Sequence, residues 1–129
     1  MQTSCYARLK QFAAAGLVPV GISRGVPRWF NGQVDQRLAP TRAMLSMSQV
    51  EYNRLFAEIL AKLDPVEVYQ GLPENAVLLC WEAPGVSCHR RWVAEWLEQA
   101  NGVVIPEFGF ERAECKPYRA MPGKAARDD

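Results

Sequence analysis

The sequence predicts a small three-layer α/β domain with a mainly parallel, Rossmann-like sheet and flanking helices. Short, dense apolar runs typical of strands occur at residues 17–23, 76–82 and 103–106. Residues 48–64 and 89–100, which follow the first and second runs, carry apolar side chains at helical spacing. Helical connections between consecutive strands favour parallel pairing, because each connection returns the chain to the same end of the sheet.

The composition fits one globular domain. The chain has 129 residues, of which 49% are hydrophobic and 22% charged, and a chain of this size can bury a core. We expect the domain to span residues 1–110 and a polar tail to span residues 111–129. The net charge of +1 gives no reason to expect a general nucleic-acid or membrane surface.

The expected location is the cytoplasm. No signal-peptide pattern opens the sequence, and no apolar run reaches the length of a membrane span. The cysteines Cys5, Cys80, Cys88 and Cys115 lack the spacing of a small secreted domain. We therefore expect all of them to be reduced thiols.

The N-terminal segment predicts a helix followed by a strand. Residues 4–14 have apolar side chains at helical spacing, and Gly16 follows as a stop signal. In the strand at 17–23, Pro19 suits the first residue of a strand or an edge strand, since proline has no N–H to donate.

Residues 24–46 show no sustained periodicity and predict a long loop. Apolar residues in it require burial, so disorder is not expected. Its arginines make it basic, so it could wall a ligand site or form an ordered surface loop. The apolar residues are Val26, Trp29, Phe30, Leu38, Met44 and Leu45, and the arginines are Arg24, Arg28, Arg37 and Arg42.

The helix at 48–64 has the clearest signal in the chain. Ser48 and Glu51 form a capping-box pattern at its start. A short helical turn over residues 66–72 is expected before the central strand.

The stretch 76–100 is the one around which the chain is organised. Its strand leads through a turn at residues 83–86 into the helix at 89–100, whose apolar face includes Trp92 and Trp96. A strand, a tight turn and a helix N-terminus together present reactive side chains at one edge of a sheet.

Parallel strands that end at Ser23 and Glu82 would meet at the edge where open α/β sheets bind ligands. Cys88 begins the helix beside His89 and arginines, and these features lower a thiol pKa. Cys88 is therefore a candidate nucleophile, with a buried small side chain as the alternative. Glu82 is a candidate general base or the ion-pair partner of an arginine, and His89 could serve a ligand or Glu82.

Ligand binding at the same edge is expected from Ser23 and from Arg24, Arg42 and Arg90. A guanidinium group presents a planar fork of donors that suits bidentate contacts with phosphate or carboxylate. An anionic or nucleotide-like ligand is the class that these residues favour.

Several sharper assignments fail on spacing. A phosphatase or rhodanese-type loop requires an Arg six residues after its Cys, but Val86 and Ala94 stand there. Zinc would require ligands beyond Cys80, Cys88 and His89, and no cysteine pair has C-x-x-C spacing. Glycine-rich phosphate motifs are absent too. No metal and no cofactor is therefore expected.

The motif Leu79-Cys80-Trp81-Glu82, a short loop and then Cys88-His89-Arg90 resembles the signature of the domain of unknown function 488 family. The segments Ile22-Ser23-Arg24 and Leu38-Ala39-Pro40 resemble its short members, and the likeness covers residues 17–110. The resemblance implies a compact intracellular α/β fold. It also implies a shared site made of Arg24, Glu82, Cys88, His89 and Arg90.

Two functions remain open from the sequence. One is an enzyme that acts on a small anionic or nucleotide-like substrate through Cys88 or Glu82 with arginine clamps. The other is a non-catalytic module that binds a nucleotide, a nucleic-acid end or a protein partner at the same edge.

Overall fold

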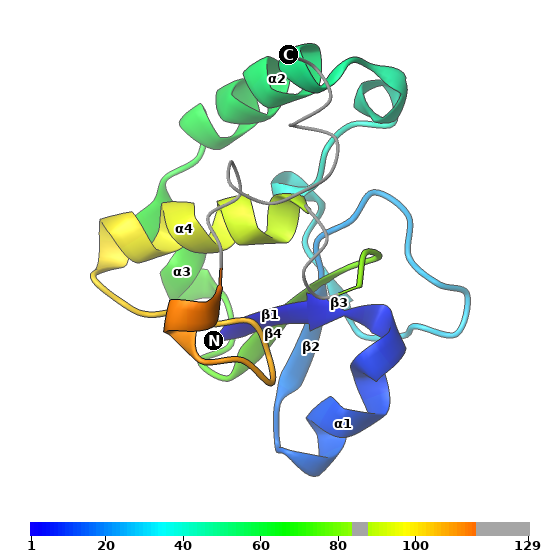
Figure 1. Ribbon diagram of the computed structural model, residues 1–129, viewed down its shortest axis with the longest axis vertical. Helices are drawn as coiled ribbons and strands as arrows, with labels where there is room; N and C mark the ends of the chain where they lie inside the picture. The colour runs from blue at the N-terminus through cyan, green and yellow to red at the C-terminus, as the bar shows by residue number, and fades with distance from the viewer. Residues whose placement is uncertain (84–87, 116–129) are drawn as a thin grey trace.

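The computed structural model describes residues 1–83 and 88–115, and in them it forms one four-stranded, all-parallel sheet with the order β1-β4-β2-β3 (Figure 1). The strands are β1 (Gln2–Cys5), β2 (Val18–Gly21), β3 (Gln33–Val34) and β4 (Ala76–Cys80). The parallel pairing expected between 17–23 and 76–82 is confirmed, because Val18 lies opposite Ala76 and Gly21 opposite Leu79. The small α/β fold class is therefore confirmed.

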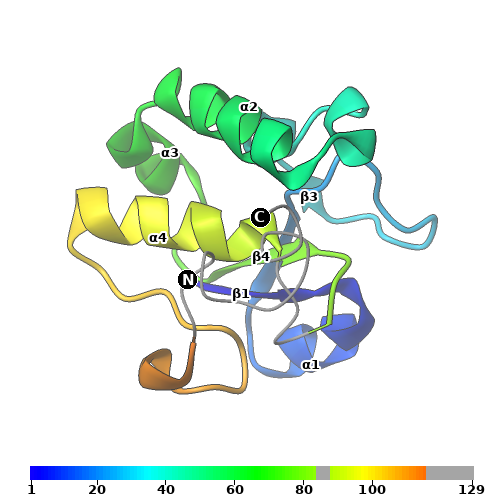
Figure 2. The ribbon, with the colours of Figure 1, turned by 45° about the horizontal axis from the view of Figure 1, so that its top comes forward.

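Helices cover both faces of this sheet. The α-helices are α1 (Leu9–Ala14), α2 (Gln49–Ala61), α3 (Pro65–Gly71) and α4 (His89–Asn101). Helix α1 lies on one side of the sheet, while α2, α3 and α4 lie on the other (Figure 2). Short 3₁₀ helices, η1 to η4, span Tyr6–Arg8, Gln36–Leu38, Ala43–Ser46 and Arg112–Glu114.

The two faces of β4 explain the layers. Successive side chains of a strand point to opposite faces, and every residue of β4 is buried. Leu78 packs into the main core with Phe56 of α2 and Leu97 of α4. Val77 and Leu79 pack into a smaller core on the side of α1. This alternation directs Cys80 towards α4, which decides the geometry of the site.

Local sequence signals set the ends of the main helices. The Ser48 hydroxyl accepts a hydrogen bond from the Glu51 N–H, as the capping pattern predicts. The Asp64 carboxylate caps α3 through the Val66 N–H. Helix α4 ends at Gly102, whose φ of 62° is the left-handed conformation that glycine adopts most readily.

The helix expected over residues 4–14 is wrong at its start. Residues 2–5 form β1 instead, beside β4, and the α-helix begins only at Leu9. Thr3 and Ser4 are fully buried although both are polar, so β1 lacks the apolar pattern of a strand.

The strand expected at residues 103–106 is also wrong. β1 occupies the place beside β4 instead. The segment that contains residues 103–107 lies along the other side of β1, with a single bridge between Thr3 and Glu107. The Ile105 N–H donates to the Glu98 carboxylate, and Pro106 has no N–H, so this segment cannot form a regular ladder.

Pro19 lies in β2, which is an interior strand, yet its missing N–H leaves no gap. Val18 and Ile22 donate their N–H groups to Asn75 and Leu79 on the side of β4. The nitrogen of Pro19 therefore faces the other side, where β3 pairs only with Val20 and Gly21.

The loop at residues 24–46 is ordered, as expected, and contains β3, η2 and η3. Phe30, Leu38 and Met44 are buried in it, but Trp29 and Leu45 are exposed, against the expectation. The turn at 83–86 and the tail at 111–129 fall largely outside the described residues, and residues 112–114 form η4. Among the residues described, no helix is both long and apolar enough to cross a membrane.

Candidate functional site

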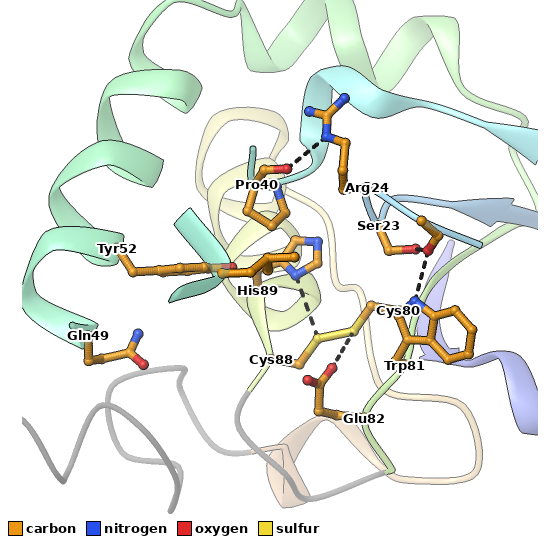
Figure 3. Close-up of a pocket in the computed structure, with 12 residues that line it drawn as sticks. Ser23, Arg24, Pro40, Gln49, Tyr52, Cys80, Trp81, Glu82, Cys88 and His89 are labelled. Atoms are coloured by element: carbon orange, nitrogen blue, oxygen red, sulfur yellow. Dashed lines mark hydrogen bonds between the residues drawn. A yellow bond between two sulfur atoms is a disulfide. The ribbon is translucent and has the colours of Figure 1, made fainter. Parts of the chain in front are cut away.

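A cleft of about 120 Å³ lies at the carboxyl ends of β2 and β4, under the start of α2 and α4 (Figure 3). Five residues that the sequence predicted for a site line it, namely Ser23, Arg24, Glu82, Cys88 and His89. Its other lining residues are Gly25, Pro40, Leu45, Gln49, Tyr52, Cys80 and Trp81. Arg42 and Arg90 are not among the lining residues.

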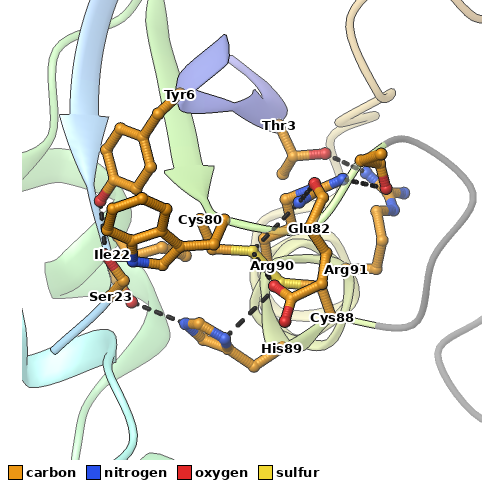
Figure 4. Close-up of a disulfide and its surroundings, with 12 residues drawn as sticks. Thr3, Tyr6, Ile22, Ser23, Cys80, Glu82, Cys88, His89, Arg90 and Arg91 are labelled. Atoms are coloured by element: carbon orange, nitrogen blue, oxygen red, sulfur yellow. Dashed lines mark hydrogen bonds between the residues drawn. A yellow bond between two sulfur atoms is a disulfide. The ribbon is translucent and has the colours of Figure 1, made fainter. Parts of the chain in front are cut away.

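Cys80 and Cys88 are joined by a disulfide at the floor of this cleft, so the expectation of reduced thiols is wrong for this pair (Figure 4). Cys80 ends β4 on the face that meets α4, and Cys88 is the N-cap residue of α4. Their Cα atoms are 7.4 Å apart. Both cysteines are at least 95% buried, while Cys5 and Cys115 are free.

His89 lies beside the sulfurs with its two ring nitrogens in different roles. Nε2 lies 2.6 Å from the Ile22 carbonyl oxygen. Because a carbonyl only accepts, Nε2 carries the proton, and Nδ1 presents its lone pair 3.7 Å from the Cys88 sulfur. Burial lowers the pKa of His89 to about 4. The charge of Arg90 adds to this shift, while the bond to Ile22 opposes it, so the ring is neutral at pH 7.

Arg90 is fully buried behind the cysteines, so its placement does not support the ligand clamp expected for it. Its Nη2 and Nε donate to the two carboxylate oxygens of Glu107 at 2.7 and 3.1 Å. Its Nη1 donates to the Cys80 sulfur at 3.0 Å and to the Glu82 carbonyl at 2.7 Å. The positive charge that was expected beside Cys88 therefore contacts Cys80.

A second buried arginine extends this network. Arg91 donates through Nη1 to the Thr3 hydroxyl and to the Ile105 carbonyl, both at 2.9 Å (Figure 4). The Thr3 hydroxyl in turn donates to Glu107. Burial lowers the pKa of the Arg91 guanidinium. Glu107 thus connects both arginines, a role that no motif in the sequence indicated.

Arg24 lines the cleft, but its guanidinium points away from the sulfurs (Figure 3). Nε donates to the Pro40 carbonyl at 3.0 Å, and Nη1 donates to the Gln36 side chain at 2.9 Å. The Gln36 amide returns a hydrogen bond to the Arg24 carbonyl. Arg24 therefore links the start of the long loop to Gln36 and Pro40 near its other end. None of these contacts is with a carboxylate, so none of them neutralises the charge of Arg24.

Trp81 forms an open aromatic wall beside the cysteines. The residue is 57% exposed, yet its Nε1 donates to the Gly25 carbonyl at 2.8 Å. Tyr6 packs edge-on against it, with ring centroids 5.3 Å apart. The hydrogen bond at Nε1 and the packing of Tyr6 fix the orientation of the indole ring, and its open face is exposed to solvent.

Tyr6 also fixes Ser23. The Ser23 hydroxyl donates to the Gly25 carbonyl at 2.7 Å, so the Tyr6 hydroxyl must be the donor of their 2.6 Å hydrogen bond. Burial raises the pKa of Tyr6, and the contacts with Ser23 oppose that rise. The sequence predicts Tyr6 within the helix over residues 4–14, and no motif in it indicates this role.

Glu82 is half-buried at the rim, and its carboxylate lies 3.5 Å from the Cys80 sulfur. It forms no ion pair within the described residues, so the arginine partner considered for it is absent there. The cleft thus combines a sulfur pair, a neutral imidazole, a carboxylate and an aromatic face.

We compared the chain with models of known protein families, with curated proteins and with solved structures, and none of them matches it.

Proposed function

We propose that the protein binds a small nucleotide-like ligand in this cleft and that the Cys80–Cys88 pair is the reactive group there. The observation that carries the proposal is the open face of Trp81 beside the sulfurs, at the carboxyl edge of a parallel sheet. An intracellular, cytoplasmic location and a relationship to the domain of unknown function 488 family are part of the same proposal.

The aromatic wall supports a planar ligand. Stacking of a base on an aromatic side chain contributes about 1–3 kcal/mol and tolerates every base, because each base has a π-face. The carboxylate of Glu82 at the rim can accept from an exocyclic amino group of the base. A cleft of about 120 Å³ suits the base or the sugar alone, so the rest of the ligand would extend into solvent.

The anionic part of the ligand would be attracted by nearby positive charge but would not be held by a bidentate contact with an arginine. The donors of Arg24 are directed to Pro40 and Gln36, so this arginine attracts an anion without forming a bidentate contact. The N-terminal end of α4 adds a partial positive charge at the same edge.

Catalysis would require the reduced pair. A thiol reductant, or a phosphine together with a water molecule that supplies the protons, provides two electrons and two protons and converts the disulfide to two thiols. Glu82 can then accept the proton of Cys80, and the Arg90 N–H group stabilises the resulting thiolate. In this mechanism either Cys80 or Cys88 can be the nucleophile, and Glu82 is the general base.

One observation favours a non-catalytic binding module instead. The sulfur pair is bonded and is almost fully buried, so it could serve only as a brace between β4 and α4. The ligand would then bind on Trp81 without any chemical change.

The first test is calorimetric titration with the four ribonucleoside monophosphates and with inorganic phosphate. We expect the nucleotides to bind and Trp81→Ala to weaken their binding about 5–150-fold, which is the loss of one stacked base. Trp29→Ala is the matched control, because Trp29 is 59% exposed but lies outside the cleft. Equal losses in both variants, or no binding at millimolar nucleotide, would contradict the proposal.

The second test separates the enzyme from the module. Nucleotides that bind are incubated with reduced protein, with the Cys80→Ser variant and with the Cys88→Ser variant, and the products are followed by mass spectrometry. Conversion that the wild type performs and at least one of the variants does not supports catalysis. Binding without conversion by the reduced wild type assigns the module.

A further inference from the structure

We propose that Cys80, Cys88 and His89 form a binding site for Zn²⁺ when the cysteine pair is reduced. This goes beyond the ligand site argued above and does not depend on nucleotide binding. It also reverses the sequence-based expectation of no metal, which rested on the need for ligands beyond these three residues and on the absence of C-x-x-C spacing.

The donor atoms already lie close together. The two sulfurs and a ring nitrogen of His89 are all within 4.8 Å of one another, and all three residues are buried. Bonds of about 2.3 Å to sulfur and 2.0 Å to nitrogen place the ligands of a tetrahedral Zn²⁺ roughly 3.5–3.8 Å apart. The distance of 3.7 Å between His89 Nδ1 and the Cys88 sulfur matches this range.

The backbone leaves room for an ion between the sulfurs. The Cα atoms of Cys80 and Cys88 are 7.4 Å apart, whereas Cα atoms of disulfides are usually about 4.4–6.8 Å apart. When the pair is reduced, the two sulfurs can therefore separate without a movement of β4 or α4.

His89 is oriented as a metal ligand. Its Nε2–H donates to the Ile22 carbonyl, which fixes both the tautomer and the direction of the ring. Metal-binding histidines almost always donate their second nitrogen in this way, since the bond aims the remaining lone pair. Here that lone pair faces the sulfurs (Figure 4).

The charges of the site also balance. Two thiolates neutralise a divalent cation, which permits its burial. The Arg90 N–H group at 3.0 Å from the Cys80 sulfur can stabilise that thiolate. Because Arg90 is paired with Glu107, this donor adds no net charge beside the cation.

The fourth position of the ion faces the cleft. The Glu82 carboxylate lies 3.5 Å from the Cys80 sulfur on that side and can fill the position, or a water molecule can. Three protein ligands with one open position are typical of zinc sites that perform chemistry.

Electrons and protons balance in the conversion of the disulfide form to the zinc-bound form. A thiol reductant delivers two electrons and two protons and is itself oxidised to a disulfide, whereas a phosphine delivers the two electrons and becomes its oxide while water supplies the oxygen and both protons. In either case the protein disulfide becomes two thiols. Zn²⁺ then displaces both thiol protons, which pass to the buffer. Oxidation of the pair removes two of the ligands, so the oxidised protein should not bind the ion.

The test uses Co²⁺ as a spectroscopic probe of the Zn²⁺ site. The full chain is reduced with a phosphine under nitrogen and titrated with Co²⁺. We expect one ion per chain, a sulfur-to-cobalt charge-transfer band in the near ultraviolet, visible bands of tetrahedral intensity, and displacement of the cobalt by Zn²⁺. The oxidised protein should show none of these signals.

Variants then assign the ligands. Cys80→Ser and Cys88→Ser should lose most of the charge-transfer band, and His89→Gln should weaken binding by more than the roughly 10–100-fold typical of an outer-shell loss. Cys115→Ser is the control, since Cys115 is free and lies outside the cleft. Loss of the band in Cys115→Ser with retention in Cys80→Ser and Cys88→Ser would overturn the assignment.

A measurement on the wild type keeps the proposal testable if a variant fails to fold. Reduced protein is treated with iodoacetamide with and without Zn²⁺, and each cysteine is followed by mass spectrometry. We expect Zn²⁺ to slow the alkylation of Cys80 and Cys88 at least tenfold and to leave Cys115 unchanged. Equal rates with and without Zn²⁺, or the absence of a cobalt–sulfur band, would contradict the site.

Discussion

Arg90 and Glu107 form a buried, bidentate ion pair, with Arg90 Nη2 2.7 Å and Nε 3.1 Å from the two carboxylate oxygens. The arginine is 0% exposed and the acid 5%. The pair fixes the first turn of α4 to the segment that runs past β1, and it directs the remaining Arg90 donors to Cys80 and to the Glu82 carbonyl. The sulfur pair of the cleft therefore depends on a salt bridge behind it.

Glu107→Gln should destabilise the protein by about 3–5 kcal/mol, because it leaves the charge of Arg90 buried without a counter-charge. The measurement is urea unfolding at pH 7, followed by circular dichroism. Glu58→Gln is the control, since Glu58 pairs with Arg54 on the exposed face of α2. Its midpoint should stay within error of the wild type. A similar midpoint for Glu107→Gln would show that the buried pair contributes nothing.

The disulfide makes a prediction about thiol counts. In denaturant without a reductant, a thiol reagent should find only Cys5 and Cys115, and after reduction it should find all four cysteines. In the folded protein, half-exposed Cys115 should react well before Cys5, which is 3% exposed. Four reactive thiols in the unreduced, freshly purified protein would mean that the pair is a dithiol in solution.

Labelling of the reduced, folded protein tests whether Cys88, the candidate nucleophile predicted from the sequence, reacts faster than Cys80. Cys88 is 5% exposed and Cys80 is 1% exposed, which favours that order. The arginine donor now belongs to Cys80, however, so Arg90→Ala should slow Cys80 more than Cys88. Equal slowing of both would show that the effect comes from general loosening of α4.

The free energy of unfolding should decrease at acid pH, and the protonation of Glu98 should contribute to this decrease. Burial alone would raise the pKa of this carboxyl, but hydrogen bonds from Arg112 and from the Ile105 N–H lower it below the usual value. A depressed carboxyl pKa stabilises the fold fully above the unfolded-state pKa of about 4.3. This contribution is lost as the pH falls through the lower, folded-state pKa. Unfolding midpoints measured from pH 7 down to acid should decline less steeply in Glu98→Gln than in the wild type.

Much of the fold was predictable because its signals are local. The cap at Ser48 lies where the sequence predicts it, and α4 ends at Gly102, close to the end of the helix predicted over residues 89–100. β1 was missed because Thr3 and Ser4 are buried only through pairing with β4, a contact between residues far apart in the chain. Trp92 and Trp96 were expected on the core face of α4, but they are half-buried at its margin, while Val93 and Leu97 are fully buried.

The topology of the sheet predicted which residues share the cleft, but it did not predict the partners of the buried side chains. The rule that parallel strands share an edge brought Ser23, Glu82, Cys88 and His89 into one cleft. It could not assign Arg90, because the side chain at the start of a helix turns inward or outward according to its partner. That partner is Glu107, 17 residues later in an irregular segment without periodicity.

Gly21 gives the sharpest test of how the cleft edge is held. A Cβ at this position would lie 2.7 Å from the Tyr6 hydroxyl and 3.3 Å from Cγ1 of Val26. Gly21→Ala should therefore displace Tyr6 from Ser23 and destabilise the protein by about 1–3 kcal/mol, as overpacking does. Gly25→Ala is the matched control, since a Cβ there meets nothing within 4 Å. Urea unfolding measures both variants.

A double-mutant cycle with Tyr6→Phe identifies the cause of that loss. Removing the hydroxyl removes the nearest obstacle to the new Cβ, so Gly21→Ala should cost less in the Tyr6→Phe background than in the wild type. The Ser23 hydroxyl keeps its bond to the Gly25 carbonyl in both backgrounds, so the cycle isolates the contact between residues 6 and 21. Equal costs in the two backgrounds would show that the strain arises at Val26 and that Tyr6 does not control the edge of the cleft.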